Sequence, residues 1–305
     1  MNSFRTAVVA GAALAISAGS ANALSITQVF DASNANAATN TLIPALLAPG
    51  SGITVVGGTP ALQGNIFGFN FSQTGTYTGF NLAPSSGSTP TLALPNGIFL
   101  TSGTANIPLS NTVNSFDPFT PASGSSTQLS NLSVSAGGSP VTNDANVLGF
   151  SFMVAPGITS ISAQFVFGSD EFPTQNVTDI FGFFVDGVNY AKFPGGELIS
   201  NTPGNPTNFI SNPVGGGLYD IEYNGLTQVF TVTGLLDPNV AVHTILIGVA
   251  DTADSIFDSG VFIGALKAGQ DGGGGITTGV PEPATLALFG SGLLGLAMLR
   301  RRRRA

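Results

Sequence analysis

The stretch ISAQFVFG (residues 161–168) decides the fold class of this 305-residue chain. Its apolar side chains stand at every second position, with Ser, Gln and Val between them: Ile161, Ala163, Phe165 and Phe167. A period of two, carried by β-branched and aromatic residues, is typical of a half-buried strand. We therefore expect a strand here, with Phe165 and Phe167 in a core.

The same period recurs on both sides of this stretch. VLGFSFMVA (residues 147–155) alternates in the same way and adds Phe150 and Phe152 to the expected core, and NIFGFNF (residues 65–71) alternates through its phenylalanines. Shorter or fully apolar runs follow at residues 180–185, 228–233, 242–250 and 261–266. Clusters of Gly, Pro, Asn and Ser separate the runs, as turns require.

One segment indicates a helix. Residues 35–48 (ANAATNTLIPALLA) favour a short N-terminal helix that Pro44 limits to a few turns. Many strands with polar turns and little helix predict an all-β chain. We expect an antiparallel β-sandwich or jelly roll, built as one domain over residues 24–268.

Charged residues are scarce between the two ends of the chain, and most of them are acidic. Between residues 24 and 279 there are 15 acidic residues and two lysines, a net charge of −13. Such a surface repels nucleic acid, and we expect no nucleic-acid partner. The chain has no cysteine, which excludes disulfides, thiol nucleophiles and thiolate metal sites.

The first 23 residues read as a secretory signal peptide. Arg5 precedes an apolar run at residues 7–16, and Ala21-Asn22-Ala23 supplies the small-x-small cleavage pattern. We expect a signal peptidase to cut between Ala23 and Leu24. An N-terminal anchor helix is the alternative, but the apolar run is too short to span a membrane comfortably.

The other end of the chain carries an uncharged run and then five cations. Residues 284–299 (ATLALFGSGLLGLAML) give a helix of ~24 Å, a little short of the ~30 Å hydrocarbon core. The cations that follow favour the cytoplasmic side and act as a stop-transfer signal. They are Arg300, Arg301, Arg302, Arg303 and Arg304. The Gly-rich residues 269–280 before the run predict a flexible linker.

The whole layout of residues 281–305 resembles the PEP-CTERM sorting signal of Gram-negative bacteria. Pro281, Glu282 and Pro283 come first, and the apolar helix and the arginine cluster follow. The resemblance implies that an exosortase recognises and processes the tail during export. It also implies an inner-membrane intermediate, then a cell-surface, outer-envelope or matrix protein of a bacterium that makes exopolysaccharide.

The region between the two ends resembles a second family, the choice-of-anchor L domain, over residues 26–266. The segments that carry the likeness are SGITVVGG (51–58), GIFLTSG (97–103), FVFGSDEFPTQNVTDIFGFFVDG (165–187) and VADTADSIFDSGVFIGAL (249–266). The resemblance implies an extracellular β-rich module that is found with different anchoring tails. It implies no established catalysis.

Acidic residues gather in two loops that each follow an apolar strand. They are Asp170, Glu171 and Asp179 in the first loop, and Asp251, Asp254 and Asp258 in the second. Repulsion between neighbouring carboxylates is relieved by a cation, and hard oxygen ligands on loops suit Ca²⁺. The alternative is a set of solvated or capping turn acids, with Asp170 and Asp258 bonding local backbone N–H groups.

Catalysis has weak support. A glycoside hydrolase would use the same acids as an acid/base pair, but the chain has no Trp to line a sugar site. His243, the only histidine, alternates with Ile245 and Ile247 and is expected to be packed, and no G-x-S-x-G elbow is present. We therefore expect no enzyme. A structural or adhesive surface or biofilm protein is favoured over a calcium-dependent carbohydrate-binding module, and a hydrolase comes third.

Overall fold

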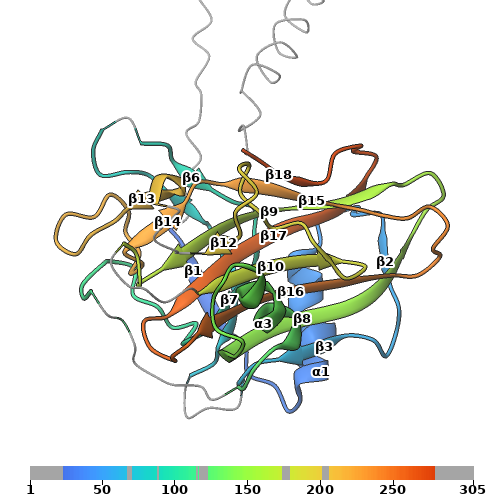
Figure 1. The fold of residues 1–305 in the computed structure, drawn as a ribbon, viewed down its shortest axis with the longest axis horizontal. Coiled ribbons are helices and arrows are strands. Elements are labelled where there is room, and N and C mark those ends of the chain that lie inside the picture. Colours follow the sequence, from blue (N-terminus) through green and yellow to red (C-terminus); the bar gives the residue numbers. More distant parts are fainter. Residues whose placement is uncertain are drawn as a thin grey trace, which may run out of the picture.

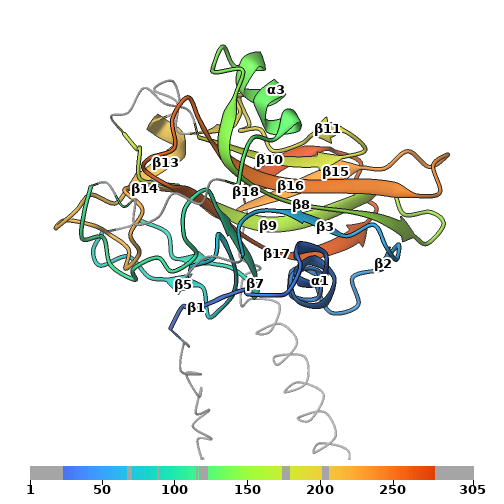
Figure 2. The same ribbon diagram turned by 90° about the horizontal axis from the view of Figure 1, so that it is seen from below.

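Two antiparallel sheets lie face to face in the computed structural model of the chain (Figures 1 and 2). The structure describes residues 23–66, 71–87, 89–114, 116, 123–173, 179–200 and 206–278. The sorting tail and almost all of the expected signal peptide lie outside these residues, as does most of the strand expected in NIFGFNF. The expected all-β sandwich is confirmed.

The larger sheet has nine strands within the described residues, in the order β1-β4-β7-β17-β9-β14-β13, with β15 beside β9 and β18 beside β15. Every pair is antiparallel. The bounds are β1 (Ser25–Gln28), β4 (Thr74–Thr78), β7 (Gly97–Thr101), β9 (Ser160–Ser169), β13 (Phe209–Ser211), β14 (Gly225–Thr227), β15 (Phe230–Leu235), β17 (Ser259–Gly269) and β18 (Gly275–Thr278).

The smaller sheet has seven strands in the described part of the chain, in the order β11-β10-β16-β8-β2, with β12 beside β10 and β3 beside β8. Their bounds are β2 (Ile53–Val55), β3 (Ala61–Gln63), β8 (Thr142–Val154), β10 (Ile180–Val185), β11 (Val188–Asn189), β12 (Ile199–Ser200) and β16 (His243–Thr252). A separate hairpin joins β5 (Asn81–Leu82) to β6 (Leu92–Ala93), and a short 3₁₀ turn covers Pro206–Asn208.

The main core lies between the sheets. All four phenylalanines expected in it are at most 4 % exposed, which confirms the period-two prediction: Phe150, Phe152, Phe165 and Phe167. β10 is buried along its whole length because both of its faces are covered. Phe181 and Phe183 point into the main core, whereas Ile180 and Phe184 pack on the outer face of the smaller sheet.

The N-terminal helix forms where it was expected. It runs as α1 (Asn34–Ala37), a π-helical turn (Ala38–Leu42) and α2 (Ile43–Leu46), with Ser33 as its N-cap and Pro44 in the first turn of α2. Leu42 and Leu46 of this helix are fully buried in the main core. The helix lies along one side of the two sheets (Figure 2).

A second helix, α3 (Thr127–Ser135), was not expected from the sequence. It covers the outer face of the smaller sheet (Figure 2), where Leu129 is fully buried. A Cβ added at Gly182 or Gly248 would lie 3.1 or 3.3 Å from a Leu129 methyl group. Two glycines on neighbouring strands therefore make room for one helix side chain.

The expected linker at residues 269–280 is partly wrong. Gly275–Thr278 form β18, which pairs with β15 and extends the larger sheet, and Ile276 packs against the main core. The folded domain thus reaches Thr278. Within the described residues, no helix is long and apolar enough to cross a membrane; the span expected at residues 284–299 lies outside them.

Candidate functional site

The two acidic loops lie at the same end of the sandwich. In the larger sheet, Ser169 at the end of β9 pairs with Ser259 at the start of β17. Asp170 and Asp258 are the next residues outward, and the Asp170 N–H donates to the Asp258 carbonyl oxygen at 3.2 Å. The strand register alone therefore places these two acids side by side.

The smaller sheet brings its own acids to the same end. Ile180 of β10 pairs with Ala250 of β16, so Asp179 lies beside Asp251. Both side chains are fully buried. The Ser259 hydroxyl, from the larger sheet, donates to Asp179 Oδ2 at 2.6 Å. This hydrogen bond links an acid of the smaller sheet to a side chain of the larger sheet.

Five carboxylates are gathered at this junction, and we call them the interlayer acids. Each is at most 3 % exposed: Asp144, Glu171, Asp179, Asp251 and Asp258. Four of them are among the six acids predicted as metal ligands. Asp144, which lies next to the Asn143 partner of Asp251 in β8, was missed. It is the only acid in TNDANVLGF (residues 142–150). Its left-handed backbone (φ 47°) at a register shift cannot be predicted from the sequence.

Two of the interlayer acids, Asp179 and Asp251, have strongly raised pKa values. Burial raises the pKa of Asp179 well above its usual range, and the charges of Asp251 and Glu171 add to the effect. Burial likewise raises the pKa of Asp251, with further contributions from Asp258, Asp144 and Glu171. Carboxylates that are removed from water and close to like charges resist ionisation. The cluster is therefore electrostatically costly unless protons or a cation neutralise it.

No basic side chain of the described residues lies beside the interlayer acids to neutralise them. Lys192 and Lys267 are both exposed. His243 lies at the opposite end of β16, buried as predicted. Its Nδ1 is 2.7 Å from Asp186 Oδ2, and its ring packs on Phe152.

Asp251 is the interlayer acid whose carboxylate has the fewest hydrogen-bond donors. Neither of its carboxylate oxygens, both fully buried, accepts a hydrogen bond within the described residues. The Ser102 hydroxyl lowers its pKa. That hydroxyl also donates to the Ser259 carbonyl oxygen at 3.2 Å, so it is at most a shared donor for Asp251. Burial of a carboxylate with so few donors costs free energy, so Asp251 must be neutralised by a proton or a cation.

The other two predicted ligands are placed differently. Asp170 accepts hydrogen bonds from the backbone N–H groups of Asn224 (3.1 Å) and Phe116 (3.2 Å), and burial raises its pKa to about 8. It thus bonds backbone N–H groups, as the alternative interpretation expected, but these belong to distant segments rather than to its own turn. Asp254 is partly exposed on the loop between β16 and β17, and its Oδ1 accepts from the Ile256 N–H at 3.4 Å.

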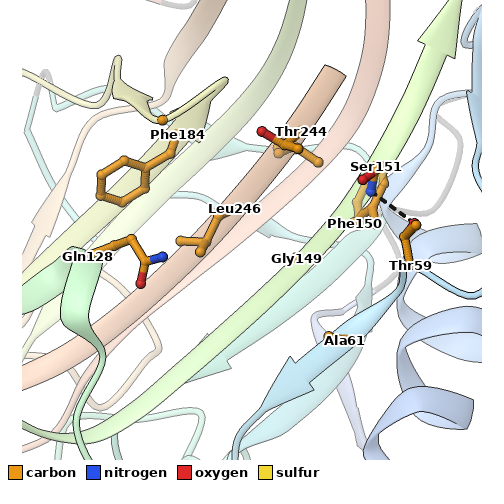
Figure 3. Close-up of a pocket in the computed structure, with 11 residues that line it drawn as sticks. Thr59, Ala61, Gln128, Gly149, Phe150, Ser151, Phe184, Thr244 and Leu246 are labelled. Atoms are coloured by element: carbon orange, nitrogen blue, oxygen red, sulfur yellow. Dashed lines mark hydrogen bonds between the residues drawn. The ribbon is translucent and has the colours of Figure 1, made fainter. Parts of the chain in front are cut away.

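A separate groove of about 280 Å³ opens on the outer face of the smaller sheet (Figure 3). Gln128 of α3 and Phe184 of β10 lie on one side of it. Thr59 lies on the other side, where its hydroxyl accepts a hydrogen bond from the Ser151 N–H at 3.0 Å. The lining mixes amide, hydroxyl and apolar groups, as small-molecule sites do. Sequence patterns had not indicated this groove.

The two antiparallel sheets packed face to face define a β-sandwich protein. The chain belongs to the choice-of-anchor L domain family, which matches residues 33–267. The PEP-CTERM protein-sorting motif matches residues 279–304, so both resemblances are confirmed. No curated protein and no solved structure matches the chain.

The sorting motif fixes the broad destination of the chain. It indicates an exported protein that an exosortase processes, with a terminal membrane segment. Both matched families are sorting or surface domains rather than families of enzymes.

Proposed function

We propose that this protein is a structural or adhesive component of the bacterial surface or biofilm matrix, linked to exopolysaccharide. One observation carries the proposal: β18 ends at Thr278, and the sorting motif begins at residue 279. The domain is joined to its tail without a long spacer. It is therefore held close to the membrane until the tail is processed, and is then delivered to the surface as a folded unit.

The start of the domain fits export as well. Leu24, the expected first residue after signal-peptide cleavage, is 7 % exposed and packs in a second apolar cluster on the outer face of the larger sheet. Ala23 before it is exposed. Cleavage between these residues would leave a mature chain that begins where packing begins.

A gene deletion with complementation tests this role. Cells lacking the gene should attach less and form less matrix, and the wild-type gene should restore both. A gene encoding Pro281→Ala, Glu282→Ala and Pro283→Ala together should fail to restore them, because the domain is not sorted. A domain variant with Val188→Ala, an exposed side chain, serves as the matched control. Normal attachment by the deletion strain would contradict the proposal.

The groove on the smaller sheet supports a second candidate, a carbohydrate-binding module. Sugars are held by amide and hydroxyl groups beside an apolar surface, and Gln128, Ser151 and Thr244 supply the polar groups here. Against it, Phe184 is only 7 % exposed, so little of an aromatic face is offered. Binding of one defined glycan on an array, lost in Gln128→Ala, would favour this candidate. Absent or indiscriminate binding would favour the structural role.

A further inference from the structure

We propose that the interlayer acids form a buried Ca²⁺ site that fastens the two sheets together at one end of the sandwich. The inference goes beyond the surface role and does not depend on it. It rests on three features of the described residues. Five carboxylates are buried together, no basic side chain accompanies them, and neither oxygen of Asp251 accepts a hydrogen bond of normal geometry.

The donor set selects the class of cation. The available ligands are oxygen atoms, mainly carboxylates, because the chain has no cysteine and its one histidine is tied to Asp186 at the opposite end of β16. Hard oxygen donors suit Ca²⁺ and Mg²⁺ rather than zinc or copper. Ca²⁺ accepts six to eight oxygens in flexible geometry, whereas Mg²⁺ demands an octahedron and keeps its waters. Irregularly placed acids from five segments therefore favour Ca²⁺.

The proposed ion would act on the fold rather than on a sugar. Glu171 and Asp258 follow or precede strands of the larger sheet, and the other three interlayer acids belong to the smaller sheet. Leu246, which lines the groove, is five residues from Asp251 along β16, or about 17 Å. Calcium at the junction would thus bridge the sheets without touching a ligand in the groove.

Binding requires the carboxylates to adjust. No group of three or more described His, Asp or Glu side chains is already arranged as a ligand set for a metal ion. The ion would therefore have to draw the carboxylates together by rotation of their side chains. Asp258 has a close neighbour of its own: a Cβ added at Gly103 would lie 1.6 Å from Asp258 Oδ2. Gly103→Ala must therefore displace that carboxylate without changing any charge.

Thermal unfolding with and without calcium is the first test. The full chain, purified in detergent and stripped with EDTA, is melted in EDTA, in millimolar CaCl₂ and in NaCl of equal ionic strength. A ligand that binds only the folded state at a hundredfold excess over its Kd raises the melting temperature by roughly 5–10 °C. We expect that rise with CaCl₂ and not with NaCl. Identical curves in CaCl₂ and EDTA would overturn the proposal.

Variants locate the site. Asp251→Asn removes a ligand and a buried charge, so it should melt above the wild type in EDTA and lose most of the calcium-induced rise. Gly103→Ala should also lose the rise. Asp254→Asn, on the same loop but partly exposed, is the matched control and should keep it. Loss of the rise in Asp254→Asn, with retention in Asp251→Asn, would overturn the assignment of the site.

A spectroscopic readout keeps the test valid if a variant fails to fold. Burial raises the pKa of Tyr223 well above its usual range, and the nearby charges of Asp258, Asp170 and Asp251 add to the effect. Tb³⁺, an oxygen-seeking stand-in for Ca²⁺, should luminesce when it is excited through this ring in the wild-type chain, and CaCl₂ should displace it. Tyr223→Phe should remove the luminescence but keep the calcium-induced rise. Luminescence unchanged in Tyr223→Phe would place the ion elsewhere.

Discussion

Single side chains join the two sheets through the centre of the main core. Phe165 of β9 packs on Phe181 of the smaller sheet, with ring centroids 5.0 Å apart, and on Phe230 of the adjacent β15 at 5.8 Å. All three rings are at most 2 % exposed. A contact of this kind holds two sheets at a fixed spacing, so its loss leaves a cavity that the sheets cannot easily close.

Truncation of Phe165 measures that contact. Phe165→Ala should lower the free energy of unfolding by about 3–5 kcal/mol, because apolar transfer energy is lost and a cavity remains. Denaturant titration followed by far-UV circular dichroism gives the value. Met153→Ala, at a side chain that is 40 % exposed, is the control and should change it little. Equal stability of Phe165→Ala and wild type would contradict the packing described for this face.

The backbones of β7 and β17 approach each other closely at Gly97. A Cβ added at Gly97 of β7 would lie 2.1 Å from the Ile263 carbonyl oxygen of β17. Backbone cannot yield as a flexible side chain can, so Gly97→Ala should cost about 1–3 kcal/mol or more. Gly57→Ala, where nothing lies within 4 Å, is the matched control for the same replacement. A thermal melt of the two variants, compared with wild type, decides whether the strands approach as closely as described.

At the scale of elements, β18 is a strand that the sequence pattern does not predict. It lies in a glycine-rich stretch, and its four residues pair with β15 through the register Phe230↔Thr278 to Thr233↔Gly275. A chain that ends after Gly274 should melt several degrees below one that ends after Thr278, because it loses this pairing and the packing of Ile276. Circular dichroism melts compare the two. Identical melting temperatures would show that the segment adds nothing to the domain.

Alternation alone predicts the long strands, because period two survives wherever one face is buried between sheets. It fails where burial is not periodic. α3 is rich in Ser, Thr and Asn and has little intrinsic preference for a helix, and only the hollow at Gly182 and Gly248 explains why Leu129 settles there. β18 fails for a related reason, since its glycines are typical of linkers and its pairing partner is more than 40 residues away.

The candidate site likewise has features that the sequence predicts and features that it does not. The two acidic loops could be predicted to meet, because strand-end loops of a sandwich gather at its ends. Asp144 could not be predicted, since a single acid inside a strand reaches the junction only through a register shift opposite β16. Asp254 has a spacing that suits a ligand, but the structure leaves it partly exposed on its loop and outside the interlayer acids.

At the scale of the whole molecule, the charge distribution follows the route of export. The domain is acidic almost throughout, and five of the eight basic residues stand together at residues 300–304. Cations next to an apolar helix resist translocation, so they hold the end of the tail on the cytoplasmic side while the domain crosses. The same scarcity of cations within the domain leaves the interlayer acids without a basic partner.

Mass spectrometry of the protein recovered from wild-type cells tests the central claim, that the chain is exported and then separated from its tail. The predicted mature species begins at Leu24 and lacks Arg300 to Arg304. Cells without their exosortase should instead accumulate a species that begins at Leu24 and keeps the tail. Recovery of a surface protein that still carries all five arginines in the wild-type host would contradict sorting and leave a permanently membrane-anchored protein.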